Sequence, residues 1–418
     1  MPETDVLLLS ELAPWPLDHG GRLRVYHLAL NLHQQGLRIR VASPGPLPND
    51  APDAIHQLTL PWPSKPDPPT TQTFLKNWQG PLAPLRHRLA RHQGINSDTY
   101  AHALTLSRQH NPAAVIAVGQ HAPMMLRGLP TDLTRIWYAA DDVVAFLLSC
   151  MRREPLSRWP SRLYSTALHT ALETAFGQLD GIVGVSNTDQ RFLNTLGRPR
   201  IGRVIPNGVD LTEFNPPTPP TNPEPQTLVF WGRLDFEPNI DGLRWFAREA
   251  WPTLHRRNPN ARWRIIGRGN HPSLAPLKTT PGIDWLGAVD DIKPHAHNAA
   301  VTILPMRCGG GIKNKLLEAL ALGRPVVCTP RALTGLPTDH RMPPVRLGST
   351  AKQLTQAIEQ LWQHPATANR LGNSARTWAT RHAGWDRTAH SFIQLINDCT
   401  PTNHQLTQTS LHTRTQAA

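Results

Sequence analysis

Three consecutive glycines, Gly309, Gly310 and Gly311, form the most informative segment of the sequence. They follow Val301–Leu304, an apolar run typical of a buried strand, and precede Lys313–Leu322, which has the pattern of a helix. A loop without side chains lets backbone N–H groups approach a phosphate closely, and the N-terminus of the next helix favours an anion. The same triplet also fits a tight strand–helix turn, so it does not establish a phosphate site alone.

Charged residues directly after this loop favour the phosphate interpretation. Lys313 and Lys315 fall in the expected first helical turn, where the helix dipole by itself prefers acidic side chains. Cations placed against that dipole indicate an anionic partner. Glu318 lies three residues beyond Lys315, on a face that could reach the same ligand, and its carboxylate could accept hydrogen bonds from a ribose diol.

Two further segments carry residues suited to a phosphate. The segment HGGR places Gly20 and Gly21 at the first expected strand–helix junction, with Arg22 directly after them. Arg233, in the segment WGRL, stands at the carboxyl end of an expected strand, where its permanently charged guanidinium is well placed for a phosphate. Arg233 could equally be an ordinary surface arginine. We expect both segments to face one cleft, where they would bind a pyrophosphate.

The elements that must position these residues alternate between strand and helix, which predicts parallel sheets with helices on both faces. Apolar residues spaced by three and four between Leu23 and Leu32 predict a helix that ends near Gly36. In the first half of the chain, strands are expected at Val6–Ser10, Arg38–Ser43, Ile55–Leu60, Ala114–Val118, Arg135–Ala139, Gly181–Val185 and Gly202–Ile205.

The proline-dense segment Asn215–Gln226 cannot continue either element and divides the chain. After it, strands are expected at Leu228–Trp231, Trp263–Gly267, Val301–Leu304 and Pro325–Cys328, with helices at Asp241–Leu254, Lys313–Leu322 and across 351–398, the last broken near Pro365 and Gly372. We therefore predict an N-terminal domain at 1–213, a linker at 214–226, a C-terminal domain at 227–384, a helix at 385–400 that crosses back to the N-terminal domain, and a disordered tail at 401–418.

The composition limits the class of protein. The 418 residues include 43 Lys and Arg against 30 Asp and Glu, a formal net charge of +13. No nucleic-acid-binding signature accompanies this charge, so we expect no nucleic-acid partner and favour an anionic small substrate or an anionic membrane. The sequence has no apolar run of about 18 residues, no basic leader and no metal-type spacing among its cysteines. We expect a cytoplasmic protein without a transmembrane helix, a metal or a cofactor.

Several motifs occur together in one order: HGGR, VSNTDQRFL, IPNGVDLTEFNP, VFWGRLDFEPN, IIGRGN and GGGIKNKLLEALALGRPVVCTPRALTGL. With this combination the chain, from about Asp5 to about Ile396, resembles the GT-B glycosyltransferases of family 4, in the glycosyltransferase-1 grouping of nucleotide-sugar enzymes. It is also similar to sugar transferases associated with exosortase-type exopolysaccharide clusters. The resemblance implies an α/β GT-B fold, with two Rossmann-like, doubly wound parallel-sheet domains facing across a cleft.

The resemblance also implies an activity: a retaining, metal-independent transferase that moves a sugar from a UDP- or GDP-sugar to a glycan or a lipid-linked acceptor. The N-terminal domain would hold the acceptor and the C-terminal domain the nucleotide-sugar. Arg233 matches the phosphate-binding arginine of the family, and Glu318 matches the second Glu of the E-x7-E signature, which binds the donor ribose in relatives. The donor site implied in this way comprises Gly20, Gly21, Arg22, Arg233, Gly267, Arg268, Gly309, Gly310, Gly311, Ile312, Lys313, Lys315 and Glu318.

Two positions depart from the family pattern. Gly310 stands where the first Glu of the E-x7-E signature is expected, and Pro238 stands where relatives often carry a phosphate-binding lysine. We expect Lys315 to supply the missing positive charge, with Lys313 as the second candidate. Arg233 and Lys315 would then stabilise the negative charge that develops on the leaving phosphate during sugar transfer.

The N-terminal candidates for catalysis are Asp141, Asp142 and His121. Family members often place a histidine at a strand end facing the donor sugar, but the corresponding segment here, WYAADDVV, carries the two aspartates instead. Both could simply be an N-cap and a first-turn acid of a helix. His121, at the end of another expected strand, could also be a partly buried loop histidine.

Two segments mix basic and aromatic residues in a way that suits an anionic membrane surface, Phe74–Gln93 and Phe146–Tyr164. A lipid-linked acceptor would be reached from such a position on the inner face of the plasma membrane, although both segments could also be solvated faces over an ordinary core. Two other functions stay open on this sequence: a nucleotide-sugar epimerase of the same fold, and a non-catalytic protein that binds a nucleotide-sugar.

Overall fold

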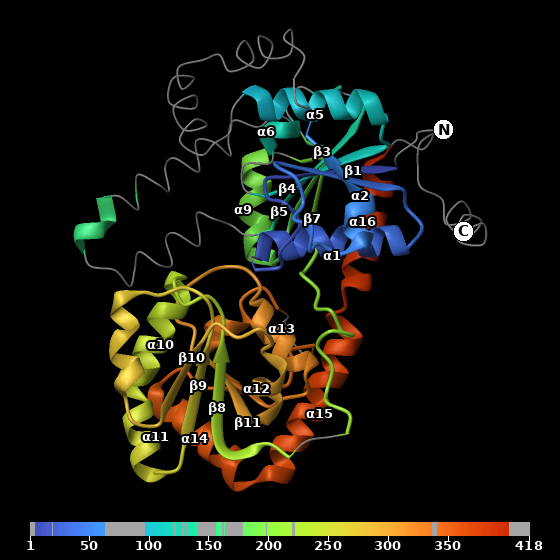
Figure 1. The fold of residues 1–418 in the computed structure, drawn as a ribbon. Helices are drawn as coiled ribbons and strands as arrows, with labels where there is room; N and C mark the ends of the chain where they lie inside the picture. Colours follow the sequence, from blue (N-terminus) through green and yellow to red (C-terminus); the bar gives the residue numbers. More distant parts are fainter. Residues whose placement is uncertain are drawn as a thin grey trace. The chain divides into compact units, whose positions relative to one another are not determined.

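The computed structural model describes residues 5–18, 20–62, 97–119, 123–126, 129–130, 132–140, 156–160, 163, 179–197, 199–219, 222–336 and 341–400. These residues fall into two compact units (Figure 1). The N-terminal unit contains the described residues up to Pro206 together with those from Trp385 onward, and the C-terminal unit contains Asn207–Gly384.

The N-terminal unit is built on a seven-stranded parallel sheet with the strand order β3-β2-β1-β4-β5-β6-β7. Every residue of β1 and β4 is buried, as expected for strands that are covered on both faces and are therefore apolar throughout. The order reverses between β1 and β4, which defines a doubly wound sheet. The strands are β1 (Val6–Ser10), β2 (Ile39–Ser43), β3 (Thr59–Pro61), β4 (Ala114–Val118), β5 (Thr134–Ala140), β6 (Gly181–Gly184) and β7 (Ile201–Val204).

The final helix of the described chain packs in the N-terminal unit, where it lies against α1 (Figure 1). Trp385 at its start stacks on His27 at 5.3 Å between ring centres, and Phe392 meets Tyr138 edge-on at 4.9 Å. The helices of this unit are α1 (Gly20–Gln34), α2 (Asp53–Leu58), α5 (Ser97–His110), α6 (Pro123–Leu126), α9 (Asn187–Gly197) and α16 (Trp385–Cys399), with a short 3-10 turn at Leu156–Arg158.

The C-terminal unit has a six-stranded parallel sheet with the order β10-β9-β8-β11-β12-β13. Its central strands form the core, and Leu228, Val229 and Phe230 of β8 are fully buried. The strands are β8 (Glu224–Trp231), β9 (Arg262–Ile266), β10 (Ile283–Gly287), β11 (Ala299–Leu304), β12 (Val326–Cys328) and β13 (Arg346–Leu347). The helices are α10 (Glu237–Glu249), α11 (Trp251–Arg257), α12 (Lys293–Asn298), α13 (Asn314–Ala321), α14 (Ala351–Gln363) and α15 (Pro365–His382), with 3-10 turns at Pro272–Thr279 and Pro330–Leu333.

Three expectations about individual elements are wrong. The strand expected at Ile55–Leu60 begins only at Thr59, because Ile55 and Leu58 bury one face of helix α2 instead. The helix expected at Asp241–Leu254 is two helices that meet at Ala250, with a proline in the first turn of α11. The break expected near Gly372 does not occur, since α15 runs through it.

Candidate functional site

The two central strands of the C-terminal sheet, β8 and β11, are neighbours at the point where the strand order reverses. In open α/β sheets, ligands bind outside the carboxyl ends of the strands at this point. The chain leaves β8 through Gly232 and Arg233, and it leaves β11 through a loop that ends in Gly309–Gly311 and continues into α13. The residues predicted from the two motifs therefore meet at the edge of the sheet where a ligand is expected.

Lys315 is the central cation of this cluster. Its Nζ atom donates to Oδ1 of Asn239 at 2.7 Å and lies 4.4 Å from the centre of the Phe230 ring. Nδ2 of Asn239 in turn donates to the backbone carbonyl of Arg233 at 2.7 Å. A Cβ atom on Gly232 would lie 2.5 Å from Nζ of Lys315, so only a glycine leaves room for the ammonium group. Lys315, on the helix after the glycine loop, is thus tied to the loop after β8.

Burial changes the protonation of the two ionisable groups on α13. Loss of solvent lowers the pKa of Lys315 to about 7, although the nearby Glu318 carboxylate opposes this shift. Burial raises the pKa of Glu318, while a hydrogen bond from Trp231 and the charge of Lys315 oppose the rise. Nε1 of Trp231 donates to Oε2 of Glu318 at 2.6 Å. A bound diphosphate would favour the charged form of Lys315. Binding of an anion would therefore restore the positive charge of this lysine.

The glycine loop has a backbone that other residues would rarely adopt. Gly309 and Gly311 have φ values of 97° and 63°, in the left-handed region that favours glycine. Lys313 is buried and donates from Nζ to the carbonyls of Gly310 and Gly311, at 2.5 and 2.9 Å. Lys313 stands at the N-cap of α13, one residue before the helix, rather than in its first turn. Its charge therefore holds the loop in place.

Arg233 is half-exposed and forms a paired contact with a residue two positions later. Its Nε and NH2 atoms donate to the two carboxylate oxygens of Asp235 at 2.9 and 3.0 Å. This hydrogen bond is the largest of the effects that together lower the pKa of Asp235. Because 49% of its side chain is exposed, the Arg233 guanidinium can still be reached by a ligand.

The loop after β9 packs against the loop after β8. The backbone N–H of Leu234 donates to the carbonyl of Arg268 at 2.7 Å, and a Cβ atom on Gly267 would lie 1.8 Å from the carbonyl oxygen of Gly232. Gly267 is therefore needed for the close approach of the two loops. The side chain of Arg268 is exposed at the same edge of the sheet, whereas Ile312 is buried beneath the glycine loop.

The predicted residues of the N-terminal unit lie at the start of α1. Gly20 and Gly21 are its first two residues, and Arg22 donates to the carbonyl of Trp15 at 2.9 Å. Nε of Arg22 also lies 3.7 Å from a carboxylate oxygen of Asp18. This segment follows β1, at the strand-order reversal of its own sheet. His121, Asp141 and Asp142 lie outside the described residues, so their part in catalysis stays a prediction.

Three residues of the C-terminal cluster were missed in the sequence, namely Trp231, Asp235 and Asn239. All three stand within the segment VFWGRLDFEPN, in which the family pattern singles out only Arg233 and Pro238. Pro238, at the position of the expected lysine, has its Cγ atom 3.1 Å from where a Cβ atom on Gly309 would lie. The polar residue directly after it, Asn239, is the one that binds Lys315.

The described residues contain neither a metal-binding cluster nor a membrane-spanning helix. No group of three or more His, Cys, Asp or Glu side chains in this part of the chain is arranged to hold a metal ion. Across the same residues, no helix is long and apolar enough to cross a membrane. The two basic, aromatic segments proposed for membrane contact lie wholly or mostly outside the described residues.

Comparison with known proteins gives a family match over part of the chain and several structures of similar fold. Residues 225–364 match the family described as glycosyl transferases group 1. No curated protein matches the chain. Solved structures of similar fold include a sucrose-phosphate synthase from Thermosynechococcus elongatus, with 15% identity and a TM-score of 0.65 over 94% of this chain and 98% of that one. Another is Anabaena HepE in complex with UDP, with 13% identity and a TM-score of 0.62 over 93% and 98%.

A third similar structure is WaaG, a glycosyltransferase involved in lipopolysaccharide biosynthesis, with 15% identity and a TM-score of 0.60 over 92% of this chain and 98% of that one. The fold is therefore GT-B, as the sequence motifs predicted. Within it, residues 225–364, which carry the cluster around Lys315, are the part of the chain that is similar to the glycosyl transferases group 1 family.

Proposed function

We propose that this protein transfers a sugar from a nucleoside-diphosphate sugar, which its C-terminal unit binds through the diphosphate and the ribose. The observation that carries this proposal is the joining of Arg233, Asn239 and Lys315 at the carboxyl ends of the central strands of a group 1 glycosyltransferase domain. Glu318, on the same helix as Lys315, supplies the carboxylate for the ribose hydroxyls.

The chemistry follows from the charges at this edge of the sheet. Cleavage of the bond between a sugar and a nucleoside diphosphate builds negative charge on the leaving phosphate. The Lys315 ammonium, the half-exposed Arg233 guanidinium and the N–H groups of the glycine loop would meet that charge in fixed positions. Because these groups are part of the protein, the proposed reaction needs no metal ion and no cofactor.

The finer points of the proposal rest on the family resemblance and on the ligands bound in similar structures. UDP is the favoured nucleotide, since HepE has been solved with UDP and with UDP-glucose, while GDP remains the alternative from the sequence. We propose retention of the anomeric configuration, a glycan or lipid-linked acceptor, a role in polysaccharide or glycoconjugate synthesis, and a cytoplasmic location with peripheral contact to the inner membrane face.

The test begins with the donor. A ligand that binds only the folded protein raises its melting temperature, so a thermal-shift screen with UDP-, GDP- and dTDP-sugars identifies the nucleotide. Turnover is then measured as acceptor-dependent release of that nucleotide. We expect Arg233→Ala and Glu318→Ala to lower turnover by about 10²- to 10³-fold while the circular dichroism spectrum is unchanged.

A matched control is Arg244→Ala, which removes an exposed arginine from the neighbouring helix α10 and should leave turnover unchanged. Near-normal turnover of either site variant at saturating donor would show that the donor site is elsewhere. Isomerisation of the sugar without an acceptor would instead identify an epimerase, and donor binding without any turnover would identify a binding protein.

A further inference from the structure

A cavity lies in the C-terminal unit, at the opposite edge of its sheet from the site described above. Its volume is about 530 Å³, within the range of pockets that bind small molecules. Its walls come from the amino ends of β8 and β11, the turn after α13, and the facing sides of α14 and α15. The residues that line it include Pro216, Arg324, Trp362 and Asn369.

Two residues that line this cavity each carry a buried nitrogen donor with no hydrogen-bond partner among the described residues. Arg324 is 9% exposed, and its Nε atom makes no hydrogen bond within the described residues. Nε1 of Trp362 is likewise buried without an acceptor in that part of the chain. Buried polar groups are nearly always hydrogen-bonded, and each exception calls for a missing water, ion or ligand. A charged guanidinium costs more free energy than a neutral group when it is buried without a partner.

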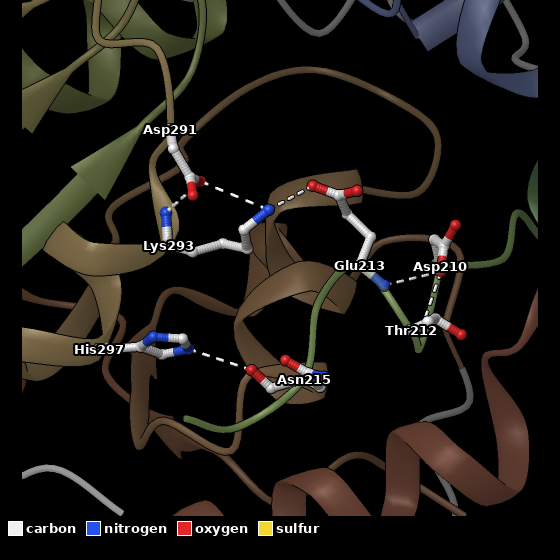
Figure 2. Close-up of polar contacts among 7 residues, drawn as sticks. All are labelled: Asp210, Thr212, Glu213, Asn215, Asp291, Lys293 and His297. Atoms are coloured by element: carbon white, nitrogen blue, oxygen red, sulfur yellow. Dashed lines mark hydrogen bonds and ion pairs between the residues drawn. The ribbon is translucent and has the colours of Figure 1, made fainter. Parts of the chain in front are cut away.

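The charge around Arg324 is also uncompensated. Among the described residues that line the cavity none is acidic, and Arg324 forms no ion pair within the described chain. The two acidic side chains on the adjoining segments, Glu213 and Asp291, both face Lys293, at 2.5 and 3.6 Å (Figure 2). Burial lowers the pKa of Arg324, but guanidinium stays charged at neutral pH. The cavity therefore carries one net positive charge.

The wall beside Arg324 is held in place before any ligand binds. The segment Asp210–Asn215 leads into the wall residue Pro216, and Figure 2 shows its contacts with α12. Oδ1 of Asp210 accepts from two backbone N–H groups of this segment, both at 2.9 Å, and His297 lies 3.1 Å from the Asn215 carbonyl. Arg376 adds bonds to the carbonyls of Phe214 and Ala321 from the other side, each at 2.8 Å.

We propose that this cavity is a binding site for a small organic anion with an apolar body. The anionic group, a carboxylate, sulfonate or phosphate, pairs with the Arg324 guanidinium and accepts from Nε1 of Trp362. The apolar body lies against the prolines and leucines of the walls, which supply more apolar than polar surface. The proposal does not depend on the sugar-transfer function, because the site shares no residue with the cluster around Lys315.

The test uses a pair of fluorescent probes of the same shape. Anilinonaphthalene sulfonate has an aromatic body with one anionic group, and N-phenylnaphthylamine has the same body without it. Titrated into the full-length wild-type protein, the sulfonate should show saturable binding to one site per chain. It should bind roughly ten- to hundredfold more tightly than the neutral probe, which corresponds to one charge-assisted hydrogen-bonded contact.

Variants then assign the site. Arg324→Gln should weaken binding of the sulfonate by roughly ten- to hundredfold and leave the neutral probe unchanged. Trp362→Phe, which removes the N–H donor and keeps a smaller aromatic ring, should give a smaller loss. The matched control is Arg370→Gln, an exposed arginine on α15 that does not line the cavity, and it should bind like the wild type.

Three results would overturn the proposal: equal affinity of the wild type for the two probes, unchanged sulfonate affinity in a folded Arg324→Gln variant, or complete displacement of the sulfonate by excess UDP. The last would place the probe at the nucleotide site. If Arg324→Gln does not fold, the two-probe comparison and the UDP competition on the wild type still test the proposal.

Discussion

The lowered pKa of Lys315 predicts that the proposed binding of UDP weakens as the pH rises. In the free protein, burial brings the pKa of this lysine from 10.5 to about 7, so it loses its proton as the pH rises through neutrality. A bound diphosphate favours the ammonium form and raises the pKa again. Binding therefore takes up a proton at any pH between these two values, and affinity falls as the pH rises.

The size of the effect follows from the protonated fraction. With a pKa of about 7, the ammonium fraction falls from about one half at pH 7 to about one hundredth at pH 9, so the dissociation constant of UDP should rise by about 50-fold. The terminal phosphate of UDP works in the opposite direction, because a phosphate monoester has its second pKa near 6 and only gains charge as the pH rises. Ionisation of this phosphate therefore cannot explain a fall in affinity over this range.

Isothermal titration calorimetry measures both the affinity for UDP and the number of protons taken up on binding. Titrations of UDP at about pH 7, 8 and 9 give the affinity, and repetition in buffers of different ionisation enthalpy gives the number of protons taken up, which should approach about one at pH 8 to 9. Lys315→Met should bind weakly with no pH slope and no proton uptake, whereas Lys352→Met, at an exposed position of α14, should behave like the wild type. Tight UDP binding in the wild type that is constant from pH 7 to 9, without proton uptake, would refute the assignment of Lys315.

Two further substitutions test how the cluster is held. Gly232→Ala should weaken UDP binding by about tenfold, because its Cβ atom would lie 2.5 Å from Nζ of Lys315. Gly287 also has a positive φ, 68° against 145° at Gly232, but it has open space around it, so in calorimetry Gly287→Ala should keep the wild-type affinity. Lys313→Met should lower the free energy of unfolding in a urea titration by about 2 to 4 kcal/mol, since two loop carbonyls lose a charged donor, and an unchanged midpoint would contradict this structural role.

The sequence predicts the fold well because its strands are covered on both faces. Runs such as Val6–Ser10 and Ala114–Val118 are apolar throughout, and the structure has strands with these same bounds. Helix ends and breaks were harder to predict, since packing decides them. Gly372 does not end α15, because a glycine there lets the helix approach the backbone of Gly323: a Cβ atom at Gly372 would lie 2.2 Å from the Gly323 carbonyl oxygen.

The site was predictable as a set of segments and less so as a set of contacts. Glycine-rich and basic motifs at strand ends predict Arg233 and Lys315 at one edge of the same sheet, where the structure has them, and their role in donor binding stays a prediction. Nothing in the sequence, however, distinguishes Lys313, which bonds to loop carbonyls, from Lys315, which reaches the loop after β8 through Asn239. That difference arises from a contact between residues 76 positions apart, which only the folded chain brings together.

The two departures from the family pattern have one common consequence. Pro238, in place of a lysine, packs beside Gly309, so the cation that this position would supply is lost and the space is closed. Gly310, in place of a glutamate, contributes a backbone carbonyl to Lys313 instead of a carboxylate to the loop. Lys313 is engaged with loop carbonyls, so the lysine that reaches the loop after β8 is Lys315, whose pKa of about 7 lies close to neutrality. A relative with a more exposed lysine at the usual position would keep its charge up to about pH 10. The pH dependence of donor binding therefore distinguishes a site that uses the buried Lys315 from one that uses an exposed lysine at the position of Pro238. The two proteins would have the same fold.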